Sequence, residues 1–391
     1  MKVIGKMKYN VRNIQLFKNF TYKNSLVVLF TPLKSSLFYN KALLFTSFHL
    51  FSTLIFAESN KDSTISTSKH NPNYLTVFRD HLSLTALICT RGTDLRIHNL
   101  DNRKQMAIYT PNNVVNYGFG INYRWFAFEG AFRIPFLDRQ DTKKGSTKSY
   151  YLEARVIRRK FWAQAFLQSN IGYYLSNVKE FDSKWFDQNT NYFLRPDVRT
   201  TIAFLSGNYI FNNRKFSYKA VSNMFEWQKK SAGSFMIGGT ITNFNCNADT
   251  SLLPFNTRDR FSKRSHVNNI NVLLSGLNLG YLHTFVIKSK MFIHLGLIQT
   301  LGFKNYRYTD AITGTADVHN GFGYILDARF ATGYNSDKLY FGASINSLFL
   351  NDSSGNQGVM EMNFIYFKLL FGKRFQNLPF VKTKKKETYE D

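Results

Sequence analysis

The sequence predicts an all-β protein, a transmembrane antiparallel up-and-down β-barrel of about 12 strands, with about 14 as the alternative count. Three observations predict this fold. Aromatic residues make up 17% of the 391 residues, and they favour pleated strands and the aromatic girdles of membrane barrels. Apolar and polar side chains alternate along many segments, and short turns alternate with long polar segments. The mean hydropathy of −0.27 agrees with this fold, because lipid-facing and lumen-facing residues cancel in the average.

Alternation with a period of two is typical of strands whose two faces meet different surroundings. In 324–330, for example, apolar side chains hold the even positions, whereas Asp327 and Arg329 hold odd positions. The same pattern predicts further strands at 116–123, 126–134, 150–156, 216–224 and 339–345. The aromatic segment Met360–Phe375 resembles the C-terminal insertion signal of outer-membrane barrels, and we expect it to close the barrel.

The connections between these strands are of two kinds. Tight polar turns are expected at Tyr123–Arg124, Arg158–Lys160, Asn212–Arg214, Lys288–Lys290 and Asn335–Lys338. Long polar segments are expected at 135–147, 172–198, 246–270, 303–320 and 350–358. Short turns at one end and long loops at the other are the arrangement of bacterial outer-membrane barrels.

The chain ends predict export. Residues 41–57, KALLFTSFHLFSTLIFA, have the cationic start, short apolar stretch and small final residue of a signal peptide. Residues 1–40 form a disordered extension or begin upstream of the true start, and 58–73 form a flexible linker. The barrel is expected to occupy 74–375, and a disordered basic tail 376–391. The predicted location is therefore the bacterial cell outer membrane.

The charge of the chain indicates its partners. Lys and Arg number 51 against 25 Asp and Glu, which gives a net charge of +26. These cations are spread through turns and loops and form no nucleic-acid-binding motif, so we expect anionic lipid and lipopolysaccharide of the outer membrane as partners, and no nucleic acid. The barrel-assembly machinery is the expected partner during insertion. Cys89 and Cys246 leave open either a disulfide or two unlinked buried thiols.

Several motifs carry a family resemblance. They are Tyr123–Trp125, Arg133–Phe136, Arg195–Asp197, Phe211–Tyr218, Gln228–Phe235 and Asp249–Pro254. Together they resemble a family of Bacteroidetes outer-membrane barrels catalogued as domain of unknown function 4421. The resemblance covers roughly 75–375 and implies an outer-membrane barrel, but it brings no catalytic residue to carry over.

Eight charged residues are expected to face the lumen: Glu129, Arg133, Glu153, Arg155, Lys219, Asp327, Arg329 and Lys368. One interpretation is a ladder of ion pairs that makes the barrel rigid, since buried charges are retained when they are paired. The other is a polar conduit whose charges select solutes.

Two further interpretations remain open. A lipid-modifying enzyme would need a Ser beside an oriented His, but the alternation turns His283 outward and His294 inward. The aromatic loop 172–198 could bind a partner or lie among lipid headgroups. No catalytic residue, metal ligand set or cofactor is predicted. The expected function is a non-enzymatic barrel with a structural or small-solute conduit role, with the enzyme and the adhesin as alternatives.

Overall fold

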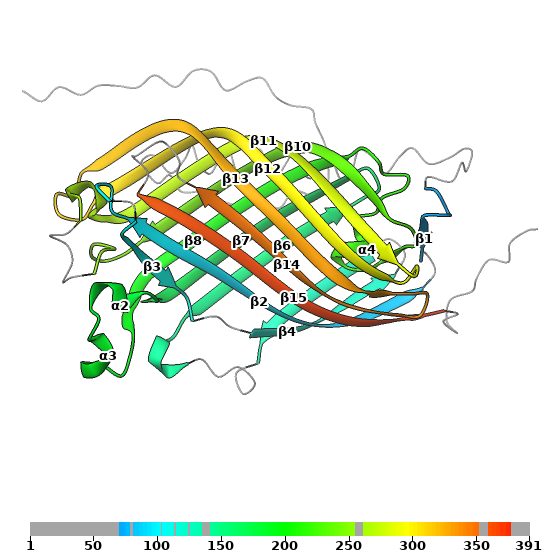
Figure 1. The fold of residues 1–391 in the computed structure, drawn as a ribbon, viewed down its shortest axis with the longest axis horizontal. Helices are drawn as coiled ribbons and strands as arrows, with labels where there is room; N and C mark the ends of the chain where they lie inside the picture. The colour runs from blue at the N-terminus through cyan, green and yellow to red at the C-terminus, as the bar shows by residue number, and fades with distance from the viewer. Residues whose placement is uncertain are drawn as a thin grey trace, which may run out of the picture. The chain divides into compact units, whose positions relative to one another are not determined.

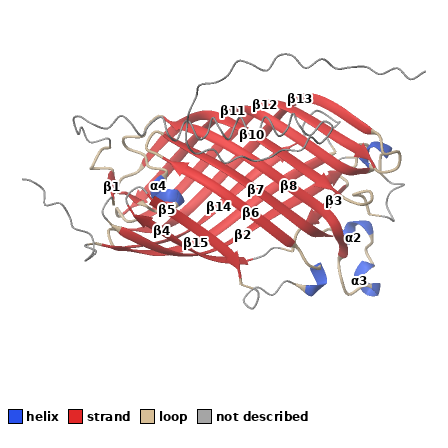
Figure 2. Cartoon of the chain, turned by 180° about the vertical axis from the view of Figure 1, so that it is seen from behind, coloured by secondary structure: helices blue, strands red, loops and turns tan. Residues whose placement is uncertain are grey.

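The computed structural model describes residues 70–78, 81–102, 104–112, 115–123, 126–134, 141–254, 261–351 and 359–376. Strands dominate these residues, and helices are few and short (Figure 2). No helix in these ranges is long and apolar enough to span a membrane. The predictions for 1–40, for the signal peptide at 41–57, for most of the linker and for nearly all of the tail fall outside the described residues.

The strands are β1 (Leu75–Val77), β2 (Leu82–His98), β3 (Met106–Thr110), β4 (Val115–Tyr123), β5 (Phe126–Arg133), β6 (Lys148–Ile157), β7 (Phe161–Leu175), β8 (Phe193–Ile210), β9 (Glu226–Gln228), β10 (Ala232–Asn247), β11 (Val267–Ile287), β12 (Met291–Asp310), β13 (Ala316–Asn335), β14 (Leu339–Asn351) and β15 (Met360–Phe375). The helices are α2 (Val178–Phe181), α3 (Trp185–Gln188) and α4 (Lys219–Ser222), with 3-10 turns η1 (Thr142–Lys144) and η3 (Lys263–Ser265).

The sheet closes into an antiparallel barrel (Figure 1). The last strand, β15, pairs with β2 from Met360 opposite Ile97 to Phe375 opposite Leu82, which confirms that the C-terminal strand closes the barrel. The closed ring runs β2, β15, β14, β13, β12, β11, β10, β8, β7, β3 and back to β2. Its ten strands differ from the predicted 12, because β4, β5 and β6 belong to the sheet but lie outside the ring.

One sector of the sheet accounts for the difference in strand number. β3 and β4 pair with successive stretches of the same edge of β2, so they act as one interrupted strand. β5 then pairs with β4, and β6 pairs with β7. Within the described residues β5 and β6 share no ladder, so the ring is closed there by the short β3 alone.

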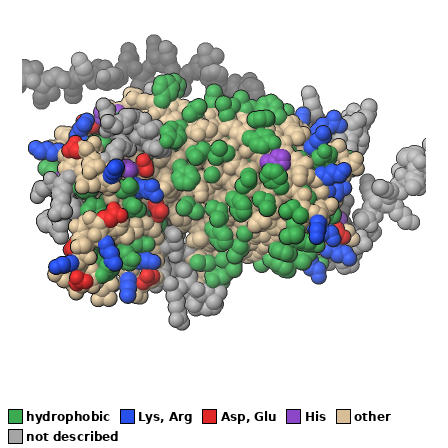
Figure 3. All heavy atoms as spheres, in the orientation of Figure 1, with side chains coloured by type: hydrophobic (Ala, Val, Ile, Leu, Met, Phe, Trp, Pro, Cys, Tyr) green, Lys and Arg blue, Asp and Glu red, His purple; other side chains and the backbone are tan. Residues whose placement is uncertain are grey.

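The barrel wall has two unlike faces. Large apolar side chains such as Leu277, Phe303, Phe322 and Phe371 are well exposed on the outer face. Figure 3 shows such side chains spread over the middle of the barrel, with charged side chains gathered at the two ends. Polar side chains such as Asn278 lie buried on the inner face. This confirms the alternation from which the fold was predicted.

The two ends of the barrel also differ. Short turns, α4 and β1 lie at one end, here called the turn end, and α2 and α3 lie at the opposite end, here called the loop end (Figure 1). The predicted long loop at 303–320 is wrong, because β12 continues to Asp310 and β13 starts at Ala316. The polar residues of 303–320 lengthen the β12–β13 hairpin. Thr309 pairs with Ala316, and only five residues connect the two strands.

Candidate functional site: a plugged lumen

The connection between β8 and β10, residues 211–231, is here called the plug. The sequence predicted a hairpin here, with a tight turn at Asn212–Arg214 and a strand at 216–224. This prediction is wrong, because the chain after Asn212 turns, forms α4 and packs against inward-facing residues of the wall. Phe216 is fully buried beside Trp162 and Leu282. Alternating apolar residues thus arise here from packing inside the barrel and not from a wall strand.

The plug also receives the segment that precedes the barrel. β1 pairs antiparallel with β9, from Leu75 opposite Gln228 to Val77 opposite Glu226. Gln228 fixes the plug's own folding, since its amide donates to the carbonyl oxygens of Lys215 (2.7 Å) and Lys230 (2.9 Å). Each of these contacts satisfies a backbone group that the plug would otherwise leave unpaired away from water.

Glu226 is the main polar anchor of the plug. Its carboxylate accepts from Arg159 Nη2 at 2.8 Å and from Ser217 Oγ at 2.5 Å, and its backbone oxygen accepts from Asn335 Nδ2 at 2.9 Å. Trp227 Nε1 donates to the carbonyl oxygen of Ser289 at 2.7 Å. The plug is therefore tied to the β6–β7, β11–β12 and β13–β14 turns at once.

Arg374 near the end of β15 adds a fourth attachment. Its guanidinium donates to the backbone oxygens of Met224 and Ser336 and to Asn335 Oδ1 at 2.9 Å. It also lies over the rings of Phe78 and Tyr340, with centroid distances of 4.0 and 4.3 Å. Both terminal nitrogens of this buried guanidinium therefore donate hydrogen bonds, and aromatic rings lie against it.

Ion pairs also occupy the lumen beside the plug. Glu153 accepts from Arg155 Nε at 3.1 Å and from Arg155 Nη2, and it also accepts from Tyr151 Oη at 2.9 Å and Gln164 Nε2 at 2.7 Å. Arg155 and Glu153 are thus paired within the wall formed by β6 and β7.

The second ion pair reaches the plug directly. Arg329 makes two parallel bonds to the carboxylate of Asp327, at 3.0 Å from Nε and 2.6 Å from Nη2, and both side chains are buried. The remaining arm of Arg329 donates to the Tyr218 hydroxyl of the plug. The guanidinium also lies 4.5 Å from the ring of Trp162.

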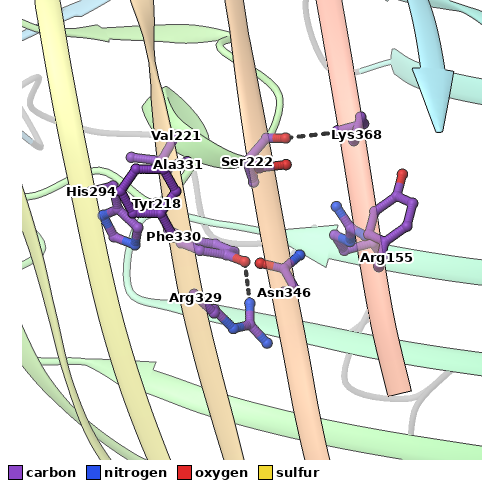
Figure 4. Close-up of a pocket in the computed structure, with 12 residues that line it drawn as sticks. Arg155, Tyr218, Val221, Ser222, His294, Arg329, Phe330, Ala331, Asn346 and Lys368 are labelled. Atoms are coloured by element: carbon purple, nitrogen blue, oxygen red, sulfur yellow. Dashed lines mark hydrogen bonds between the residues drawn. The ribbon is translucent and has the colours of Figure 1, made fainter. Parts of the chain in front are cut away.

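The third ion pair also contacts the plug directly. Lys368 Nζ lies 3.1 Å from Glu129 Oε1, and it donates to the backbone oxygen of Ser222 in the plug at 3.1 Å. Figure 4 shows Lys368 and Arg329 directed at the plug residues Ser222 and Tyr218. Two of the three lumen ion pairs therefore also hold the plug in place.

Little space remains beside the plug. Arg155, His294, Asn346 and Lys368 are among the residues that line a cavity of about 20 Å³, which has room for about one water molecule (Figure 4). Both lumen side chains and plug residues such as Tyr218 and Ser222 line this cavity.

Uncharged polar side chains continue the filling along β8, β10, β11 and β12. Asn278 Nδ2 donates to Asn208 Oδ1 at 2.7 Å and to Ser206 Oγ at 3.1 Å, and Thr300 Oγ1 donates to Asn278 Oδ1 at 2.9 Å. Thr240 Oγ1 donates to Ser206 Oγ at 3.0 Å. Such a connected network stabilises a specific arrangement of the lumen.

The eight residues predicted to face the lumen have three different outcomes in the structure. Glu129, Glu153, Arg155, Asp327, Arg329 and Lys368 form the three ion pairs described above. The side chain of Arg133 lies outside the described part of β5. Lys219 belongs to α4 of the plug and not to a wall strand, which corrects its predicted place. Burial lowers the pKa of Lys219, and Arg159 and Arg158 lower it further, while Glu226 acts in the opposite direction.

Sequence reasoning missed the plug residues that complete the site, Tyr218, Ser222 and Glu226. A signal for them existed in the family motifs, because Phe211–Tyr218 and Gln228–Phe235 are joined by the bond from Ser217 N to Gln228 Oε1 at 3.0 Å. At the loop end Arg195–Asp197 and Asp249–Pro254 also meet, since Arg195 Nη1 donates to the Ser251 oxygen at 2.8 Å.

The two histidines that bear on the enzyme interpretation lie on different faces of the wall. His283 is partly exposed on the outer face and bonds Tyr281 Oη at 3.0 Å, whereas His294 is buried in the lumen and bonds Thr284 Oγ1 at 3.0 Å. In these bonds neither imidazole contacts a serine. Among the described residues there is no cluster of three His, Cys, Asp or Glu that could hold a metal. Cys89 and Cys246 are free and buried.

The aromatic side chains of the loop end pack against one another. Phe181 of α2 stacks on Phe261 with ring centroids 6.1 Å apart, and Trp185 of α3 meets Phe193 edge-on at 5.9 Å. Trp185 Nε1 also donates to the Asn191 oxygen at 2.8 Å. The predicted loop at 172–198 is shorter than expected, because β7 ends at Leu175 and β8 starts at Phe193.

A family model described as "Domain of unknown function (DUF4421)" matches residues 61–375. No curated protein matches the chain. Among solved structures, the toluene transporter TodX of P. putida is 8% identical, with 77% of this chain and 92% of that chain covered and a TM-score of 0.28. The translocator domain of the autotransporter NalP from Neisseria meningitidis is 9% identical, with 86% and 98% covered and a TM-score of 0.27. Likenesses this remote carry no argument about what this chain binds.

Proposed function

Given that the chain belongs to the DUF4421 family, we propose that it is a non-enzymatic β-barrel of the bacterial outer membrane that works as a small-solute conduit held closed by its plug. The observation that carries this proposal is the double use of Arg329 and Lys368. Each is paired with a wall carboxylate and also holds a plug atom, Tyr218 Oη and Ser222 O respectively.

Two features support a conduit over an inert barrel. The lumen is lined by polar and charged groups, which a solute or ion path requires. The plug is one continuous connection of 21 residues whose two ends lie close together, since Asn212 Nδ2 donates to the Gly233 oxygen at 2.8 Å. It can therefore leave the lumen without breaking a wall ladder between β8 and β10.

The alternative functions have weaker support. The enzyme interpretation would need the two histidines in one site, but His283 and His294 bond different partners on opposite faces of the wall. The adhesin interpretation rests on the aromatic loop, whose rings are used mainly in packing against one another. A purely structural barrel remains the direct rival of the conduit.

Conductance measurements in planar bilayers distinguish the conduit from a purely structural barrel. The full chain is compared with a variant in which residues 213–231 are replaced by a four-residue Gly-Ser linker, so that Asn212 and Ala232 are rejoined. We expect little conductance from the full chain and a stable open conductance from the variant. In the variant, Arg155→Gln and Arg329→Gln should each shift the cation-to-anion selectivity. A folded variant that stays silent would assign the barrel a structural role and overturn the conduit.

A further inference from the structure

The turn end of the barrel carries an excess of exposed positive charge. In the connections at this end the exposed cations are Arg158, Lys160, Arg214, Lys215, Lys230, Lys288, Lys290 and Lys338, and Lys373 near the end of β15 adds a ninth. These nine residues are here called the basic rim. Asp337 is the only exposed acid among the described residues of these connections.

The loop end lacks this excess. In its described connections the exposed cations are Lys104, Lys143, Lys179, Lys184, Lys263 and Arg264, and the exposed acids are Asp101, Asp141, Glu180, Asp187 and Asp249. Figure 3 shows the same contrast, with blue side chains dominating the end where Figure 1 places β1 and α4, and red and blue mixed at the other end. The two ends therefore present different potentials to their surroundings.

The basic rim borders the apolar outer face. Ile287 and Met291, both well exposed, directly flank the turn that holds Lys288 and Lys290. Phe371 is also exposed and lies two residues before Lys373. Since a strand rises about 3.3 Å per residue, these cations lie within reach of the level where lipid acyl chains give way to phosphates.

We propose that the basic rim binds the phosphate groups of anionic phospholipids in the leaflet at the turn end of the barrel. The inference rests on the proposed membrane location. The occupant is a lipid and not a soluble anion, because the cations border the apolar face around the barrel instead of gathering in one pocket. The cations that anchor the plug, Arg159 and Arg374, are not members of the basic rim; they are engaged with Glu226 and with backbone oxygens.

Lipid selectivity tests this proposal in bilayers that contain the full chain. Electron spin resonance compares the motionally restricted fraction of spin-labelled phosphatidylglycerol with that of spin-labelled phosphatidylcholine. We expect phosphatidylglycerol to be preferred roughly fivefold at low ionic strength and the preference to fall sharply near 1 M salt. The variant Lys160→Gln, Lys288→Gln, Lys290→Gln and Lys338→Gln should lose most of it.

The matched control removes four lysines from the loop end, Lys104→Gln, Lys143→Gln, Lys179→Gln and Lys184→Gln, and should keep the preference. Equal restriction of both lipids, or equal loss in both variants, would overturn the proposal. Binding of soluble polyglutamate to the rim without lipid preference would assign it to a soluble partner instead. A chain that never enters bilayers as a folded band would count against the membrane barrel itself, which distinguishes the two failures.

Discussion

At the scale of single residues, the lumen shows how buried charge is accommodated. Asp327 and Arg329 lie two apart on β13, so the alternation of the strand directs both side chains inward. Their two parallel bonds satisfy both carboxylate oxygens, and the third guanidinium arm reaches Tyr218. Sequence alone could place these two side chains on one face, but it could not identify Tyr218 as the third member.

Replacing Asp327 with Asn should leave the buried Arg329 without its counter-charge. Breaking a buried ion pair from one side costs about 3–5 kcal/mol, so the free energy of unfolding in urea should fall by about that amount. Asp317→Asn is the matched control, since Asp317 is an exposed acid on the same strand, and its effect should stay within about 0.5 kcal/mol. Equal stability of the two variants would show that the pair does not stabilise the closed barrel.

At the scale of elements, wall strands were predictable and the plug was not. Residues 339–345 alternate because one face meets the outside of the barrel and the other meets the lumen. In 216–224 the apolar residues Phe216, Tyr218 and Ala220 are spaced equally well, but all three are buried around a turn and α4. Alternation indicates that one side of a segment is buried, but it does not indicate which part of the molecule covers that side. The ends of β12 and β13 gave the opposite error, because strand pairing continues there through a largely polar stretch of sequence.

Loosening the plug should expose it to protease. Glu226→Ala removes the acceptor of Arg159 and of Ser217, so the plug loses its strongest polar anchor. We expect trypsin to cleave after Lys219 at least about tenfold faster than in the unchanged chain, because a lost buried network costs more than about 1.4 kcal/mol. The exposed Asp187→Ala in α3 serves as control. Unchanged protection of Lys219 would mean that Glu226 does not hold the plug.

Glycines permit close approach of strands in the wall. Gly276, Gly302 and Gly323 pair in a row across β11, β12 and β13. A Cβ atom added at Gly302 would lie 2.0 Å from the Ser275 oxygen, which is backbone and cannot yield. Gly302→Val should therefore sharply reduce the folded fraction on unboiled gels, whereas Gly207→Ala should be tolerated because nothing lies within 4 Å of its added Cβ. Equal folding of both variants would contradict this account of the row.

At the scale of the whole molecule, the described residues combine a closed wall, an apolar outer face and a plugged polar lumen. The pairing of β15 with β2 over the full length of β15 is needed to close the ring, so the fold depends on contacts between distant parts of the described chain. In the proposed conduit, the plug would move without breaking a ladder of this ring. The class of fold could be predicted from composition and alternation, whereas the ten-strand ring could not, because β3 and β4 share one edge of β2.

The central claim, a closed barrel in the outer membrane, is tested most directly by comparing unboiled and boiled samples of membrane fractions on denaturing gels. A closed barrel resists detergent until it is heated, so we predict a faster-migrating band in the unboiled outer-membrane fraction that shifts to full apparent mass on boiling. A single unshifted band in the soluble fraction would contradict the account.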